Sequence, residues 1–65
     1  MNKPTVGRIV HFLNSDGALE AALIIHVWSE TCVNLAVWNQ NGTQRSQSSV
    51  VIGLEANQWQ WPARV

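Results

Sequence analysis

The chain has 65 residues, with four basic and four acidic side chains and therefore no net charge. It is one small domain, and it lacks the clustered cations that non-specific nucleic-acid binding needs. Its single cysteine excludes an internal disulfide, and that cysteine and the two histidines lack the paired spacing of a zinc site. We therefore expect no metal and no cofactor.

So short a chain buries little apolar surface for its own stabilisation. For a domain of this size, hydrophobic burial and the conformational entropy lost on folding are roughly equal. Small domains usually depend on a disulfide, a metal or a partner subunit, and this sequence offers neither of the first two. We expect the chain to form a homo-oligomer.

The first half of the chain predicts two strands joined by a turn. Residues 6–13 form the first strand, in which Gly7 indicates a bulge or a close backbone approach. The sequence Asn-Ser-Asp-Gly at 14–17 predicts a turn. Residues 18–24 could form a helix by propensity, but the β-branched residues that continue to Val27 favour a strand entering a hairpin.

Two apolar runs, 21–28 and 32–38, flank the polar break Ser-Glu-Thr and predict a central hairpin. One register keeps apolar residues together on one face. It pairs Val27 with Val33, Ile25 with Leu35 and Leu23 with Val37. The second face is also too apolar for solvent, and we expect it to contact another subunit. The residues predicted at that interface are Ile24, Trp28, Ala36 and Trp38.

The second half predicts further short strands. Asn41 and Gly42, within the turn 39–43, predict another hairpin. The polar residues 44–49 form either the exposed start of a strand or a mobile loop, and 50–52 close a fourth strand. Residues 59–62 predict a last extended segment that Pro62 keeps from a central position. No internal repeat is evident. The fold class is all-β: a small antiparallel SH3-like barrel over residues 1–65, or a five-stranded open sheet that closes by dimerising.

The aromatic content is unusual, with four tryptophans and no tyrosine. Such rings either fill a core and a subunit interface or offer a flat surface to a planar ligand. An arginine can bind phosphate or carboxylate through its guanidinium group. The ligand-binding residues that we predict from these types are Arg8, His11, His26, Asn34, Arg45, Trp59 and Trp61.

His26 and Cys32 form the one candidate pair for nucleophilic catalysis, because the predicted register makes them diagonal neighbours. No acid orients the histidine and no oxyanion-binding element is evident, so we expect an inert thiol and no enzyme. The four carboxylates fall in predicted turns and loops and are interpreted as solvated charges.

Three stretches of the chain together form a pattern that other proteins also have. They are Lys-Pro-Thr-Val-Gly-Arg-Ile-Val-His-Phe at 3–12, Val-Trp-Ser-Glu-Thr-Cys-Val-Asn-Leu at 27–35 and Trp-Gln-Trp-Pro at 59–62. Together they resemble a group of small proteins from tailed phages and prophages, whose members often carry histidine where this chain has Gln60. The resemblance implies a phage accessory protein in the bacterial cytoplasm, and it brings no activity with it. The lone thiol and the absence of a signal peptide also favour the cytoplasm.

These observations favour a non-catalytic binding protein. We expect pockets between subunits to hold a small anionic planar ligand, such as a nucleotide immune signal that the protein would sequester. The alternative is an adaptor that binds a host or phage protein through its apolar sheet face. Nucleic acid and membranes are not expected partners.

Overall fold

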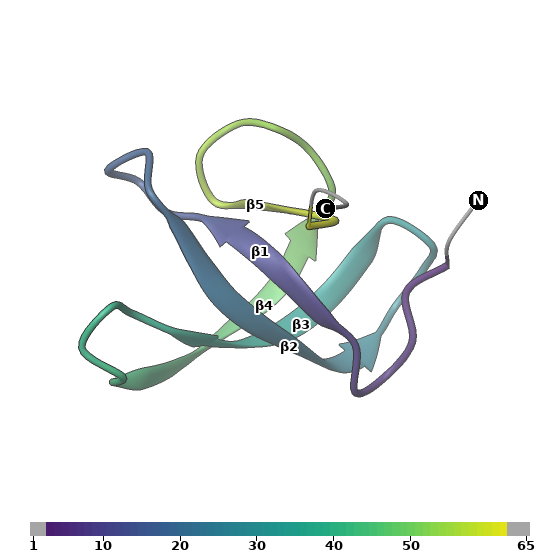
Figure 1. The fold of residues 1–65 in the computed structure, drawn as a ribbon. Helices are drawn as coiled ribbons and strands as arrows, with labels where there is room; N and C mark the ends of the chain where they lie inside the picture. Colours follow the sequence, from purple (N-terminus) through teal and green to yellow (C-terminus); the bar gives the residue numbers. More distant parts are fainter. Residues whose placement is uncertain (1–2, 63–65) are drawn as a thin grey trace.

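The computed structural model describes residues 3–62, and these residues form five β-strands (Figure 1). The strands are β1 (Ile9–Leu13), β2 (Leu19–Val27), β3 (Cys32–Trp38), β4 (Gln44–Val51) and β5 (Gln58–Gln60). Residues 18–24 continue into β2 without a helix, as the β-branched run predicted. None of the described residues forms a helix long and apolar enough to cross a membrane.

The strands form one antiparallel sheet in the order β4-β3-β2-β1-β5. The sheet curls strongly, so that its two edge strands approach each other (Figure 1). A single parallel bridge between Ile52 and Trp59 joins the end of the β4 segment to β5. The fold is an open half-barrel, which confirms the predicted all-β class and five-stranded sheet.

Alternation along the strands places the core inside the curl. β1, β2 and β3 each turn every second residue inward, and β4 and β5 add one buried residue each. The fully or nearly fully buried members are Val10, Phe12, Ala22, Ile24, Val33, Leu35, Val37, Val50 and Trp59. Trp59 is the largest of these side chains, and its indole N–H donates to the carbonyl of Thr31 at 3.1 Å. The one N–H of this ring is therefore satisfied although the ring is completely buried.

The central hairpin has the predicted register only near its turn. Val27 pairs with Val33, but Ile25 is a bulge, so Ile24 pairs with Leu35. The extra residue moves Ile24 into the core and turns Ile25 outward. The predicted pairs Ile25–Leu35 and Leu23–Val37 are therefore wrong, and Leu23 pairs with Ala36.

A second irregularity lies on the other side of β3. Ser48 and Ser49 stand opposite Asn34, because the register shifts between Val33 and Leu35. Ser49 has a φ of 54°, in the left-handed region, and its amide donates to Asn34 Oδ1 at 2.8 Å. The Asn34 side chain thus satisfies the amide at the bulge. The whole of 44–49 belongs to β4, which decides between the strand and the loop predicted for these residues.

The first strand is shorter than predicted, because a turn occupies residues 5–8. The Gly7 amide donates to the carbonyl of Ile24 at 2.8 Å, and Arg8 accepts from the Ile24 amide at 2.9 Å. Gly7 has a φ of 96°, a conformation that favours glycine. The close backbone approach predicted at this glycine is present.

Two turns of the sheet are built on the same plan, 25 residues apart. Asn14 and Asn39 each accept, through Oδ1, the amides two and four residues further on, at 2.9 to 3.0 Å. Gly17 and Gly42 have φ of 85° and 87° and donate to the carbonyl of the asparagine in their own turn. The sequence pattern is Asn-x-Asp/Asn-Gly in both. The two hairpins therefore share a local turn motif, which is too short to count as an internal repeat of the chain.

Candidate functional site

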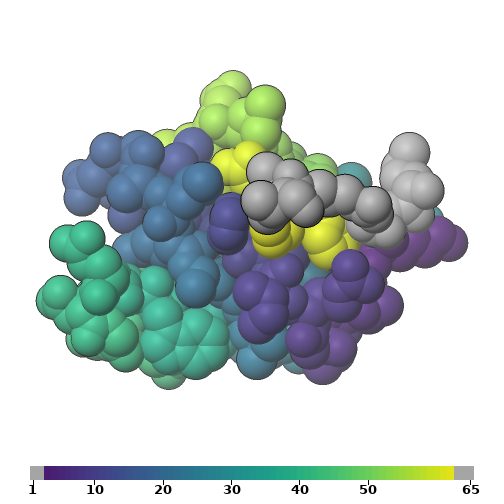
Figure 2. Space-filling view, viewed as in Figure 1, coloured from purple at the N-terminus to yellow at the C-terminus, as the bar shows by residue number. Residues whose placement is uncertain are grey.

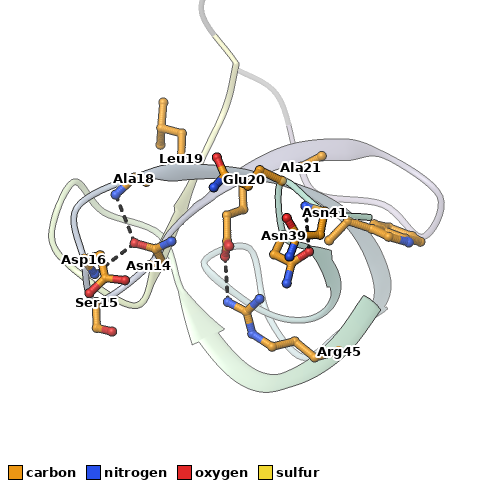
Figure 3. A pocket seen from close by; sticks show the side chains of 12 residues that line it. Asn14, Ser15, Asp16, Ala18, Leu19, Glu20, Ala21, Asn39, Asn41 and Arg45 are labelled. Atoms are coloured by element: carbon orange, nitrogen blue, oxygen red, sulfur yellow. Dashed lines mark hydrogen bonds and ion pairs between the residues drawn. The ribbon is translucent and has the colours of Figure 1, made fainter. Parts of the chain in front are cut away.

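An open cleft of about 620 Å³ lies between the two equivalent turns (Figure 3). Its walls are residues 14–16 and 18–21 from the β1–β2 hairpin, and residues 38–41 and 45 from the β3–β4 hairpin. Because each turn is fixed by its own asparagine side chain, both walls are held in place without a ligand.

An ion pair crosses the cleft from one hairpin to the other. Arg45 Nη2 lies 2.6 Å from Glu20 Oε1 (Figure 3), and Arg45 also lies over the Phe12 ring, with Cζ 5.7 Å from the centroid. The Glu20 side chain is only 10% exposed, whereas that of Arg45 is 38% exposed. The two residues occupy the same position in the two hairpins, six residues after the asparagine.

This pair changes the titration of Glu20. The hydrogen bond from Arg45 lowers the pKa of the Glu20 carboxyl from its ordinary value of 4.5, and a hydrogen bond from the Asn14 side chain acts in the same direction. Burial acts in the opposite direction but is the weaker influence on the pKa. Glu20 is therefore charged at neutral pH, and its interpretation as a solvated carboxylate is wrong.

A second cluster lies on the outer face of the sheet, at the tip of the central hairpin. Trp28 Nε1 donates to Asn34 Oδ1 at 2.8 Å, and the His26 ring packs edge-on against Trp28 at 4.4 Å between centroids. The Trp28 residue is nevertheless 61% exposed. Its indole is held in one orientation while most of its surface remains in water.

A third cluster joins the two ends of the described chain. Arg8 Cζ lies 5.2 Å from the centroid of the Trp61 ring, and Trp61 packs edge-on against Trp59 at 5.2 Å. Figure 2 shows the N-terminal segment beside the C-terminal one on this face. Arg8 is exposed and Trp61 half-buried. Within residues 3–62, no carboxylate lies at ion-pair distance from Arg8.

The seven predicted ligand residues thus do not form one pocket within a single chain. Arg45 lines the cleft, His26 and Asn34 belong to the outer cluster, and Arg8, Trp59 and Trp61 form the third group. Trp59 cannot offer a stacking surface, because its ring is 0% exposed and its N–H is bonded to Thr31. His11 is half-buried on β1, where it pairs with Ala21 and Gln60.

The residues predicted at a subunit interface differ in their exposure to solvent. Ile24 is 0% exposed in the core of the single chain and so has no surface for a partner. Ala36 is buried on β3 and Trp38 is half-buried, whereas Trp28 is largely exposed. The outer face is still apolar, because the bulge puts Ile25 on it beside Leu23 and Ile9.

The His26 and Cys32 side chains are not joined by a hydrogen bond; His26 contacts Trp28 and pairs with Asn34. Cys32 is a half-buried free thiol.

The sequence-based prediction missed Glu20 and the polar ends of the two turns. A signal for them existed: the repeated Asn-x-Asp/Asn-Gly pattern places Glu20 and Arg45 at equivalent positions with opposite charges. Comparison of the chain with family models, curated proteins and solved structures gives no match.

Proposed function

We propose that this protein is a non-catalytic binding module, a phage accessory protein that sequesters a small anionic planar ligand of the nucleotide type in the bacterial cytoplasm. The observation that carries the proposal is the Arg8–Trp61 pair. It places a guanidinium group, which no carboxylate within residues 3–62 neutralises, against an indole ring. A phosphate on the guanidinium and a base on the indole are the contacts that these two groups offer.

The other two described cations are less suitable for an anion. Lys3 lies 3.4 Å from Glu30, and Arg45 lies 2.6 Å from Glu20. The cleft around Arg45 also contains Asp16, so its two carboxylates outnumber its one guanidinium group. Electrostatics therefore favours Arg8 over Arg45 as the anion ligand.

Self-association belongs to the same proposal. The outward residues of β1, β2 and β3 within the described chain include no Lys, Arg, Asp or Glu, and Ile9, Leu19 and Ile25 are exposed among them. A large uncharged apolar surface is typical of an interface. A second chain on this face would bury surface that so small a core leaves in water.

The test is calorimetry of the intact protein with cyclic dinucleotides and ADP-ribose-type nucleotides. We expect at least one of them to bind, and Arg8→Gln to weaken that binding about tenfold or more, since a charge-assisted contact is lost. Lys3→Gln is the matched control, because it removes the same charge from the same end of the chain. Absence of binding by every nucleotide, or equal binding by Arg8→Gln, would contradict the proposal.

A second candidate function, a protein-interaction adaptor, is favoured by Trp28. Tryptophan is enriched among the residues that dominate binding energy at protein interfaces, and this one is held by Asn34 while 61% exposed. Capture of a stoichiometric protein partner that Trp28→Ala no longer captures, with no nucleotide binding, would select the adaptor. Nucleotide binding that is unchanged in Trp28→Ala would select sequestration.

A further inference from the structure

The cleft between the two turns is not used by either proposed function, and its chemistry differs from that of the Arg8–Trp61 pair. We propose that this cleft binds a neutral ring that carries neighbouring hydroxyl groups, as a sugar or the ribose of a nucleoside does. The cleft shares Leu19 with the face proposed for self-association but neither Arg8 nor Trp61 of the pair proposed for nucleotide binding, so the two binding sites can fail separately.

The polar groups of the cleft are mixed in kind. Asp16 and Glu20 supply carboxylate acceptors, and Arg45 and the side-chain amides of Gln40 and Asn41 supply donors. A hydroxyl group donates and accepts through the same oxygen atom. A ring with two neighbouring hydroxyls can therefore bridge an acceptor on one wall and a donor on the other.

The charges of the cleft select against an anion. Two carboxylates and one guanidinium group line it, and the guanidinium is already paired with Glu20 at 2.6 Å. A phosphate or carboxylate entering the cleft would meet Asp16 without a free opposite charge to compensate. A neutral ligand carries no such penalty.

The lining also has an apolar part. Ala18, Leu19, Ala21 and Trp38 line the cleft, and by alternation the last three belong to the outward side of the sheet, whereas Glu20 belongs to the inward side. A pocket that combines an apolar wall with a few placed polar groups is the usual form of a small-molecule site. The Asn14 and Asn39 hydrogen bonds fix both turns in advance, so binding orders little of the backbone.

The experiment is an NMR titration of the ¹⁵N-labelled protein with four probes: methyl glucopyranoside, adenosine, adenosine monophosphate and tetrahydropyran, a ring without hydroxyls. We expect the glucoside or adenosine to shift the Trp38 indole and the amides of residues 39–41. Tetrahydropyran should give shifts about tenfold smaller at equal concentration. The monophosphate should shift these signals less than adenosine does, and Asp16→Asn should reduce that difference.

A double variant, Gln40→Ala with Asn41→Ala, removes two donor side chains that make no hydrogen bond within the described chain. We expect it to weaken the response about tenfold. Gln44→Ala, an exposed amide outside the cleft, is the matched control and should bind as the parent does. Comparison of the parent and variant amide spectra shows that each remains folded.

The probe that shifts these signals identifies the class of ligand: binding of the glucoside indicates a sugar, and binding of adenosine indicates a nucleoside. Three results would overturn the site: no shift with either hydroxylated ring, an equal shift with tetrahydropyran, or an unchanged response of the double variant. A shift at the Trp61 indole with the monophosphate alone would instead support the proposed function and reject the cleft.

Discussion

Within residues 3–62, Trp59 and Trp28 are the two tryptophans whose indole N–H is hydrogen-bonded, yet their surroundings are opposite. Trp59 donates to Thr31 and is 0% exposed, whereas Trp28 donates to Asn34 and is 61% exposed. A buried indole needs such a bond, because an unpaired N–H in the core is costly. The N–H of an exposed indole can bond to water. The hydrogen bond from Trp28 to Asn34 is therefore not needed to satisfy this N–H, and its effect is to fix the orientation of the ring.

The comparison separates two uses of the same side chain. Trp59 joins β5 to β1 and to the hairpin turn, and its ring fills the core. Trp28 adds nothing to that core and holds a large apolar surface in place over the outer face. Trp59 stabilises the fold, and Trp28 is the residue that we propose for contact with another molecule. Substitutions that affect stability and association differently can test this division.

The largest effect on stability is expected from Trp59→Ala. The change leaves a cavity at the largest buried side chain and should cost about 3–5 kcal/mol, enough to unfold a domain of this size. Chemical denaturation followed by circular dichroism measures it. A loss of only about 1 kcal/mol would mean that the core does not depend on this ring.

Asn34→Ala should have the next largest effect. It removes the acceptor of both the Trp28 N–H and the Ser49 amide, at a cost of about 2 kcal/mol. It should also broaden the Trp28 indole signal in NMR spectra, because the ring loses its fixed orientation. An unchanged indole signal would show that packing against His26 holds the ring.

The pH dependence of stability should come in part from Glu20. Because its folded pKa is lowered by Arg45, the charged pair stabilises the fold above the unfolded pKa and is lost as the pH falls through the folded value. Glu20→Gln should therefore reduce the loss of stability between about pH 6 and about pH 3. Urea denaturation across that range is the measurement, with Glu55→Gln, an exposed carboxylate, as control.

Trp28→Ala should have the smallest effect on the stability of the single chain, within about 0.5 kcal/mol, because the Ser49 amide keeps its acceptor. Its effect on association should be clear: sedimentation equilibrium should show a weaker self-association than that of the parent. Ile25→Glu, on the same face, should act alike, whereas Leu54→Glu, in the exposed loop before β5, should not. Equal association of all three variants would place the contact elsewhere.

The order of apolar and polar residues along the sequence predicts much of this fold. Alternation groups Val33, Leu35 and Val37 on one face, and all three are buried; the Asp-Gly and Asn-Gly signals located the turns at 14–17 and 39–43. Alternation could not locate the bulge at Ile25, because Leu23-Ile24-Ile25 offers apolar residues to either face. The backbone bonds of Ile24 with Gly7 and Arg8 decide which one turns inward, and they are remote in sequence.

The candidate site was harder to predict, because it depends on contacts between hairpins. Arg45 was named from its chemistry, but its partner Glu20 lies 25 residues earlier and was interpreted by its local context alone. The stacking role predicted for Trp59 failed because the curl of the sheet brings Thr31 to its indole. The contact of Trp59 with Thr31 leaves no pattern in the sequence, and the only sequence signal for the Glu20–Arg45 contact is that the two residues hold equivalent positions after the repeated turn pattern.

The plan shared by the two turns leaves some positions free to vary. In each turn the asparagine and the glycine determine the backbone, while the two residues between them, at 15–16 and 40–41, contribute only main-chain groups to it. All four of those side chains line the cleft. The side chains at these four positions can therefore be substituted, in evolution or by design, to change what the cleft recognises without altering how the chain folds.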